Sequence, residues 1–287
     1  MFRRSLMFMI SNKNTNMVSS TTNKVNNLSK IIILEGNISA GKTFLSSKLG
    51  DLLGYKVFLE PTATNPYLSL FYKEPSKYAL IMQKWLLNQR YNTFLNALQY
   101  SIENERGVIL DRSVYSDWVF AENCRSEGLI SEEGFKEYNS IRDRFLSNIP
   151  IPNITLFLDV DPKQCLQRIQ NRKRDCEQSI PLSYLSGLDN CYKKFLIEMK
   201  SKGSNVIVLD WNNFGDIDSV LHEINNDNFD INNFNSFSNS KFNDVNYKKQ
   251  QLISDIENEK NNLKEMKFFL NETNNNNFQV LNEKINS

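Results

Sequence analysis

Residues 31–43 read IIILEGNISAGKT, and this stretch decides the fold. It opens with a run of β-branched and aliphatic residues, 31–34, which is typical of a buried strand. Residues 36–43 then match the phosphate-binding pattern GxxxxGK[ST] in full, and a helical pattern follows. In this pattern the loop N–H groups converge on phosphate oxygens, Lys42 reaches the β- and γ-phosphates, and Thr43 ligates Mg²⁺. The sequence therefore predicts a nucleoside triphosphate site, and a glycine turn without ligand is the weaker alternative.

Strand and helix patterns alternate on the C-terminal side of this loop. The expected strands are 31–34, 55–60, 107–111, 154–160 and 205–210. The expected helices are 42–53, 76–104, 131–147, 162–172 and 183–201. This alternation predicts an α/β fold, a five-stranded parallel sheet with helices on both faces. Several strands end in an acid: Glu35, Glu60, Asp111, Asp159 and Asp210. Because ligands bind outside the carboxyl ends of such strands, some of these acids should face a common site.

Charge and composition exclude several classes of protein. The 287 residues carry 34 basic and 33 acidic side chains, so nothing in the charge favours a nucleic-acid or membrane-surface partner. The aliphatic run near the front is far shorter than the ~20 residues that span a bilayer. The four cysteines form no CxxC pair, and His222 is the single histidine. Chemistry based on Ser-His, Cys-His or a multi-histidine metal site is therefore nearly excluded, leaving carboxylates, arginines and lysines.

The chain divides into a core at 30–223 and three flanking segments. Residues 1–29 are rich in Ser, Asn, Thr and Met and carry no acid, which predicts either a disordered segment or an organellar transit peptide. Both interpretations stay open, and so do a cytoplasmic and a mitochondrial location. Residues 224–246 form an Asn-rich linker. Residues 247–287 predict an amphipathic helix and tail, with Glu259 interrupting the apolar pattern.

Three further patterns suggest which phosphate chemistry the core performs. Glu60 precedes Pro61 at the end of a strand, where a carboxylate could accept a proton from a hydroxyl group. Asp111 and Arg112 close the next strand and suit Mg²⁺ binding and the holding of a base or phosphate. Three arginines follow the fourth strand and could close over phosphates: Arg168, Arg172 and Arg174. Each pattern alone is weak evidence, since each also has a structural explanation.

Together these motifs resemble the deoxyribonucleoside kinase family over residues 30–223. The resemblance rests on GNISAGKT, the EP pair, DRSVYSD, FYKEPSKYALIMQKWLLNQR and RIQNRKRDCEQSIPLSYL, which occur in order with fitting spacing. It implies a P-loop kinase fold with an arginine lid. It also implies a phosphotransferase with ATP as phosphoryl donor, Mg²⁺ as cofactor and a small-molecule deoxynucleoside as acceptor.

The resemblance assigns roles to individual residues. Glu60 would take the proton of the 5′-hydroxyl, held by Arg112 and assisted by Lys42. The substrate would contact Glu60, Tyr72, Gln83, Arg90, Phe94, Arg112, Asp117, Phe120 and Glu177. Of these, Tyr72 and Glu177 bind the sugar 3′-hydroxyl, Gln83 pairs with the base edge, and Arg90 with Asp117 forms a charged pair at its far side. Phe94 and Phe120 would sandwich the base.

The same resemblance assigns the nucleotide and metal sites. ATP would contact Gly36, Asn37, Ile38, Ser39, Ala40, Gly41, Lys42, Thr43, Arg168, Arg172, Arg174, Asn213 and Phe214. Of these, Asn213 and Phe214 belong to the loop around the adenine. Thr43 and Asp111 would serve Mg²⁺.

The segments NPYL and DWVFAE resemble bacterial purine deoxynucleoside kinases. The implied function is ATP-dependent 5′-phosphorylation of deoxyguanosine or deoxyadenosine in nucleotide salvage. The alternatives are a deoxycytidine kinase, a thymidylate-type nucleoside monophosphate kinase and a non-catalytic P-loop binding protein. Family members are commonly dimeric, so a homodimer through the 76–104 helix is expected, without nucleic acid or membrane as a partner.

Overall fold

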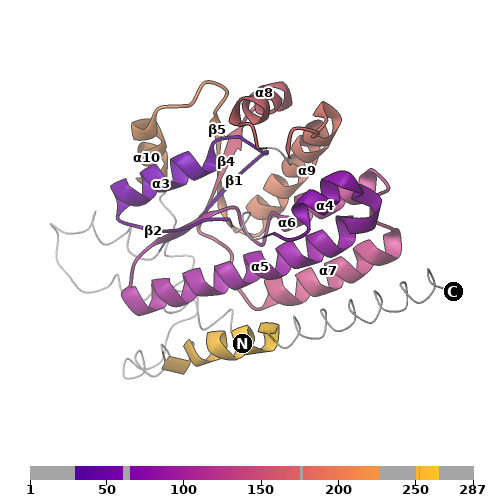
Figure 1. Ribbon diagram of the computed structural model, residues 1–287. Helices are drawn as coiled ribbons and strands as arrows, with labels where there is room; N and C mark the ends of the chain where they lie inside the picture. Colours follow the sequence, from indigo (N-terminus) through magenta and orange to yellow (C-terminus); the bar gives the residue numbers. More distant parts are fainter. Residues whose placement is uncertain (1–29, 61–64, 175–176, 226–249, 252, 265–287) are drawn as a thin grey trace, which may run out of the picture.

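The computed structural model describes residues 30–60, 65–174, 177–225, 250–251 and 253–264 (Figure 1). The expectations for residues 1–29, for most of the linker and for the tail after 264 lie outside these residues. In the described part, five parallel strands form one sheet in the order β2-β3-β1-β4-β5. The strands are β1 (Ile31–Gly36), β2 (Lys56–Phe58), β3 (Val108–Asp111), β4 (Ile154–Asp159) and β5 (Asn205–Asp210). The predicted five-stranded parallel sheet is confirmed.

The central position of β1 follows from its sequence. Its side chains are buried along the whole strand, as expected for a strand covered by helices on both faces. It pairs with β3 in the register Leu34↔Asp111 and with β4 in the register Gly36↔Leu158. The carboxyl ends of β1, β3 and β4 therefore finish at one edge of the sheet. This pairing brings the phosphate-binding loop beside the Asp111–Arg112 segment.

Helices cover both faces of the sheet (Figure 1). On one face lie α3 (Lys42–Leu53) and α10 (Ile217–Asn225). On the other lie α5 (Pro75–Asn104), α6 (Asp117–Ser126) and α9 (Leu182–Ser201). Packed against these helices are α4 (Leu68–Lys73), α7 (Glu132–Ser147) and α8 (Pro162–Arg172). No described helix has the length and the apolar character needed to cross a membrane.

The boundaries of β2 and the linker differ from the sequence expectation, and several other elements differ by one or two residues at an end. The second strand ends at Phe58, two residues before Glu60, so Glu60 lies in the segment after the strand. At its start, the Tyr55 N–H donates to the Gly50 carbonyl at 3.0 Å and closes the end of α3 instead of joining the sheet. The expected linker begins too early, because residues 224 and 225 form the last turn of α10 and Ile224 is fully buried. The core thus reaches at least residue 225.

Residues 250–251 and 253–264 are helical and pack along α5 (Figure 1). Ile256 and Leu263 belong to the buried core of the molecule. The Tyr91 hydroxyl of α5 donates to Glu259 Oε1 at 3.1 Å, so the residue that interrupts the apolar pattern faces a buried tyrosine. Lys260 also contacts Gln99. This helix therefore forms part of the hydrophobic core and is not a solvated appendage.

Candidate active site

A cavity of about 870 Å³ opens at the carboxyl edge of the sheet. Its walls come from the phosphate-binding loop, from α4 to α6, and from the segment after α8. The expected site residues on its walls are Ile38, Ser39, Gly41, Lys42, Thr43, Glu60, Tyr72, Gln83, Arg90, Asp111, Arg112, Phe120, Arg168, Arg172, Arg174, Glu177 and Phe214. Six other expected residues do not line the cavity, and of these Asn213 is exposed while the rest are buried: Gly36, Asn37, Ala40, Phe94, Asp117 and Asn213. The structure thus brings most of the predicted residues around one space.

The phosphate-binding loop needs glycine at its two ends. Gly36 has φ +148°, and a Cβ there would lie 2.9 Å from the Leu158 carbonyl oxygen. Gly41 has φ +106°, and a Cβ there would press on Phe214 and Trp211. These conformations turn the backbone N–H groups of the loop toward the start of α3, which is the arrangement that binds phosphate.

Lys42 lies inside this loop. Its Nζ donates to the carbonyls of Gly36 at 3.1 Å and of Asn37 at 2.8 Å. Burial lowers the pKa of Lys42 to about 8, and the charge of Arg112 acts in the same direction. An ammonium held in this way is ready to move to phosphate oxygens, which are stronger acceptors than carbonyls.

The side chains of Asn37 and Ala40 stabilise the loop. The Asn37 side chain donates to the Leu185 carbonyl of α9 at 2.9 Å and accepts from the Ile38 N–H at 2.8 Å. Ala40 is fully buried, and its carbonyl accepts from Arg168 at 3.0 Å. Neither side chain reaches the cavity, so any contact with a nucleotide would come from the backbone.

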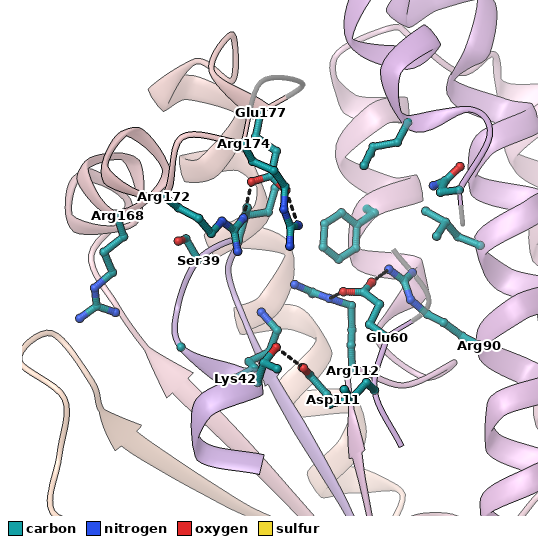
Figure 2. Close-up of a pocket in the computed structure, with 18 of the residues that line it drawn as sticks. Ser39, Lys42, Glu60, Arg90, Asp111, Arg112, Arg168, Arg172, Arg174 and Glu177 are labelled. Carbon is teal, nitrogen blue, oxygen red and sulfur yellow. Dashed lines mark hydrogen bonds and ion pairs between the residues drawn. The ribbon is translucent and has the colours of Figure 1, made fainter. Parts of the chain in front are cut away.

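Thr43 and Asp111 form a pair of oxygen ligands beside the loop. The Thr43 hydroxyl donates to Asp111 Oδ2 at 2.5 Å (Figure 2). Asp111 Oδ1 is buried and has no hydrogen-bond partner among the described residues. Burial raises the pKa of Asp111 while Lys42 opposes that rise. One hydroxyl and one carboxylate fit Mg²⁺, which is usually held by one or two protein oxygens together with substrate phosphates and water.

Glu60 lies between two guanidinium groups (Figure 2). Arg112 Nε donates to Glu60 Oε2 at 3.2 Å, and Arg90 Nη2 donates to Glu60 Oε1. Burial by itself would raise the pKa of Glu60, but Arg112 and Arg90 outweigh it and lower the pKa to about 2. Glu60 is therefore an ionised carboxylate on the cavity wall, at hand to accept a proton.

Asp117 lies behind Arg90. It is fully buried, binds Arg90 Nη1 and accepts from the Tyr138 hydroxyl at 2.6 Å. The expected Arg90–Asp117 pair is present, but Asp117 faces the protein interior while Arg90 faces the cavity. Both Arg90 and Arg112 lie over the ring of Phe120, with 5.4 and 4.6 Å between guanidinium carbon and ring centroid.

Gln83 and Phe120 also line the cavity. Gln83 Oε1 is buried and lacks a hydrogen-bond partner among the described residues, and its Nε2 lies 4.0 Å from Cys124 Sγ. An amide held like this offers a donor and an acceptor to the edge of a planar ligand.

The expectation that Phe94 helps to sandwich the base is wrong. Phe94 is fully buried and packs edge-on against Tyr115 at 5.8 Å, because it faces the core side of α5.

The three arginines after β4 separate into two groups (Figure 2). Arg172 and Arg174 both bind Glu177, and the Arg174 bond is 3.1 Å long. Arg168 instead donates to the carbonyls of Ala40, Trp211 and Asn212 and stacks under the exposed ring of Phe214 at 4.2 Å. Backbone acceptors hold the Arg168 guanidinium at the cavity wall, and its expected contact with phosphates stays a prediction.

Several wall residues were missed by sequence reasoning: Phe44, Leu59, Asn65, Leu68, Phe71, Met82, Leu86 and Tyr184. On α5, Met82 directly precedes Gln83, and Leu86 lies four residues after Met82 on the same helix face. Helical spacing could therefore have found both residues. Tyr184 lies within the quoted segment IPLSYL. Asn65, Leu68 and Phe71 also lie within the quoted segments NPYL and FYKEPSKYALIMQKWLLNQR, whereas Phe44 and Leu59 had no signal that distinguished them from core residues.

A phosphate-binding loop facing an ionised glutamate across one cavity defines the class: a P-loop phosphotransferase. The model of the deoxynucleoside kinase family (dNK) matches residues 32–234, and the chain belongs to this family. It is 92% identical over 275 residues to the deoxyguanosine kinase of Dictyostelium discoideum, covering 95% of this chain and 96% of that relative.

Two further relatives agree with this assignment. The deoxyadenosine kinase of Dictyostelium discoideum is 35% identical over 67% of this chain and 77% of its own length. The solved structure of deoxyadenosine kinase from M. mycoides with bound dATP superimposes with a TM-score of 0.60. It covers 68% of this chain and 99% of that chain at 24% identity, a likeness that concerns the fold.

Proposed function

We propose that this enzyme transfers the γ-phosphoryl group of ATP to the 5′-hydroxyl of deoxyguanosine. The observation that carries the proposal is the position of Glu60, an ionised carboxylate held by Arg112 and Arg90 on the wall of the cavity that the phosphate-binding loop also lines. A neutral alcohol brought between that carboxylate and a triphosphate has its proton acceptor on one side and its electrophile on the other.

The roles of the surrounding residues follow from phosphoryl-transfer chemistry. The transition state is loose, so positioning and charge stabilisation matter more than the basicity of Glu60. Glu60 accepts the hydroxyl proton as the new P–O bond forms. Lys42 and the loop N–H groups hold the phosphates, and Arg172 and Arg174 are near enough to the cavity to stabilise charge on the transferred group. Thr43 and Asp111 would hold Mg²⁺, which would supply positive charge to offset that of the phosphates.

The preference for guanine is supported by the donors at the base end. In the positions where adenine presents an amine donor and N7, guanine presents the acceptors O6 and N7. Arg90 offers only donors, so it suits an acceptor edge, while the Gln83 amide supplies both a donor and an acceptor. The relative at 92% identity carries the name deoxyguanosine kinase. Tyr72 and Glu177 on the same cavity are proposed to hold the sugar 3′-hydroxyl.

The direct test is an ATP-dependent phosphorylation assay with each of the four natural deoxynucleosides at equal concentration, with and without Mg²⁺. We expect kcat/KM to be highest for deoxyguanosine and turnover to require Mg²⁺. A higher kcat/KM for deoxyadenosine or deoxycytidine would contradict the base assignment and leave the reaction class intact. Nucleotide binding without turnover of any deoxynucleoside would contradict the reaction itself.

A further inference from the structure

Glu35 is a buried carboxylate that the transfer reaction does not use. It lies on β1 directly before the first glycine of the phosphate-binding loop and is fully buried. Its Oε1 accepts two hydrogen bonds from Ser113, one from the backbone N–H at 3.0 Å and one from the hydroxyl at 2.8 Å. A carboxylate that is removed from water in this way needs a structural or functional reason.

Ser113 follows Arg112, whose backbone is unusual. Arg112 has φ +68°, in the left-handed region that a non-glycine residue rarely adopts. Such conformations persist only where neighbouring groups hold them, and they occur most often at functional sites. Here both sides of the residue are held by β1. The Arg112 N–H donates to the Leu34 carbonyl at 3.0 Å, and the next N–H, that of Ser113, donates to Glu35.

The left-handed turn determines where the Arg112 side chain goes. Its guanidinium is buried, binds the Tyr192 hydroxyl and reaches Glu60 at 3.2 Å. The Ser113 hydroxyl, while donating to Glu35, also accepts from the Tyr115 N–H at 3.2 Å. Glu35 therefore holds the turn that follows β3, from which the Arg112 side chain extends to Glu60.

We propose that Glu35 is a positioning residue: by binding the N–H and the hydroxyl of Ser113 it keeps Arg112 in the left-handed conformation that directs its guanidinium onto Glu60. The proposal rests on the proposed function only in that Glu60 is the proton acceptor. For this role the Glu35 side chain must be long enough for its oxygen to accept both hydrogen bonds from Ser113. The alternative is a purely electrostatic role, in which the negative charge of Glu35 offsets the positive charges of Arg112 and Lys42.

Two substitutions separate reach from charge. Glu35→Gln keeps the length of the side chain and an oxygen acceptor but removes the charge. Glu35→Asp keeps the charge but withdraws the oxygen by one methylene group. A displacement of about 1 Å in a catalytic assembly can cost on the order of 100-fold in rate. We therefore expect Glu35→Asp to lower kcat by about 10- to 100-fold and Glu35→Gln to lower it clearly less. The reverse order would overturn the proposal in favour of the electrostatic role.

A second measurement distinguishes positioning from a general loss of structure. When Arg112 moves from Glu60, the pKa of Glu60 should rise toward the usual glutamate value of about 4.3, with Arg90 and Lys42 still opposing the rise. At about pH 4, a Glu60 with a pKa near 4.3 would be about two thirds protonated, whereas with a pKa of about 2 it stays ionised. Activity at about pH 4 relative to about pH 7.5 should therefore fall in Glu35→Asp and not in the matched control Glu198→Gln, a carboxylate paired with Arg142 away from the cavity. An unchanged pH profile in Glu35→Asp would overturn the proposal.

If Glu35→Asp does not fold, Ser113→Ala serves in its place. It removes the hydroxyl bond to Glu35 and should shift the pH profile in the same direction by a smaller amount, and an unshifted profile would overturn the proposal. All variants are assayed with whichever deoxynucleoside the unmodified enzyme phosphorylates best. A wrong base assignment therefore leaves this test intact, and a failure of the Glu35 proposal leaves the assigned reaction intact.

Discussion

Arg90 donates one hydrogen bond to Glu60 and another to Asp117, so a single guanidinium joins the proposed proton acceptor to a buried carboxylate of α6. The family resemblance assigned Arg90 to the far side of the base, and its contact with Glu60 adds a second role. With the roles proposed for Arg90 and Glu60, base recognition and proton transfer would be coupled through one side chain. A change of substrate preference at this position should also change the rate of the chemical step.

The double variant Arg90→Met, Asp117→Ala tests this coupling. The resemblance to the family implies small or apolar residues at these two positions in thymidine-preferring members, so we expect preference to move toward thymidine. We also expect kcat to fall for every deoxynucleoside, because Glu60 loses one of its two arginine partners. Steady-state kinetics with four deoxynucleosides checks both effects. A shifted preference with undiminished kcat would show that Arg112 alone keeps Glu60 in place.

Glu60→Gln should lower kcat by about 100- to 10,000-fold and leave ATP affinity nearly unchanged. The amide retains the size of the side chain but cannot accept the hydroxyl proton. ATP binding is measured by equilibrium titration and turnover by product formation. Glu198→Gln is the matched control, since its carboxylate pairs with Arg142 and Lys202 outside the cavity. Turnover within threefold of the unmodified enzyme would remove Glu60 from its assigned role.

The pH dependence of ATP use should reflect Lys42. Because burial lowers its pKa to about 8, the free enzyme loses this positive charge as the pH rises through about 8. We expect kcat/KM for ATP to fall between about pH 7 and pH 9.5 while kcat changes less, since bound phosphates stabilise the charged form. Lys42→Arg, which stays charged over this range, should bind ATP less well but show a flatter profile. A profile equally steep in both proteins would assign the titration to another group.

The helix at 250–264 should contribute to stability without taking part in the reaction. Ile256 is fully buried, so Ile256→Ala should cost about 2 kcal/mol or more and lower Tm by at least about 4 °C. Ile253→Ala, at a half-buried position on the same helix, should cost less. Thermal denaturation measures both, and kcat should stay near that of the unmodified protein.

Deletion of residues 225–287 should leave the enzyme active, because none of the described residues after 225 lines the cavity. The structure adds that the shortened protein should be less stable, because it loses Ile256, Leu263 and the partner of Tyr91. Deletion of 265–287 alone is the control. Sedimentation of both forms also tests the homodimer expected through α5, since helix 250–264 lies along α5.

The sheet could be predicted because its central strands are continuous apolar runs, buried on both faces. Three helices were missed, and α6 shows why. Its buried face carries Asp117, Glu122 and Asn123, so polar residues occupy positions where helical periodicity expects apolar ones. These residues are buried because they have partners elsewhere in the fold, and a local pattern holds no information about partners.

The same limit applies to the site. Motifs brought Lys42, Glu60 and Asp111 to one cavity, because parallel strands bring their carboxyl ends together, although Glu60 lies two residues beyond the end of β2. The Arg112–Tyr192 bond joins residues 80 positions apart, and no spacing rule indicates it. Phe94 and Arg168 were assigned from their motifs, but their surroundings decide their roles: Phe94 faces the core, and backbone carbonyls surround Arg168.

The carbonyls bound by Arg168 come from both sides of the nucleotide end of the cavity, Ala40 in the phosphate-binding loop and Trp211 and Asn212 in the segment after β5. Arg168 therefore connects the phosphate-binding loop to the segment after β5, and a shift of one segment should also move the other. An inhibitor that displaces only one of these two segments should therefore disturb the other as well.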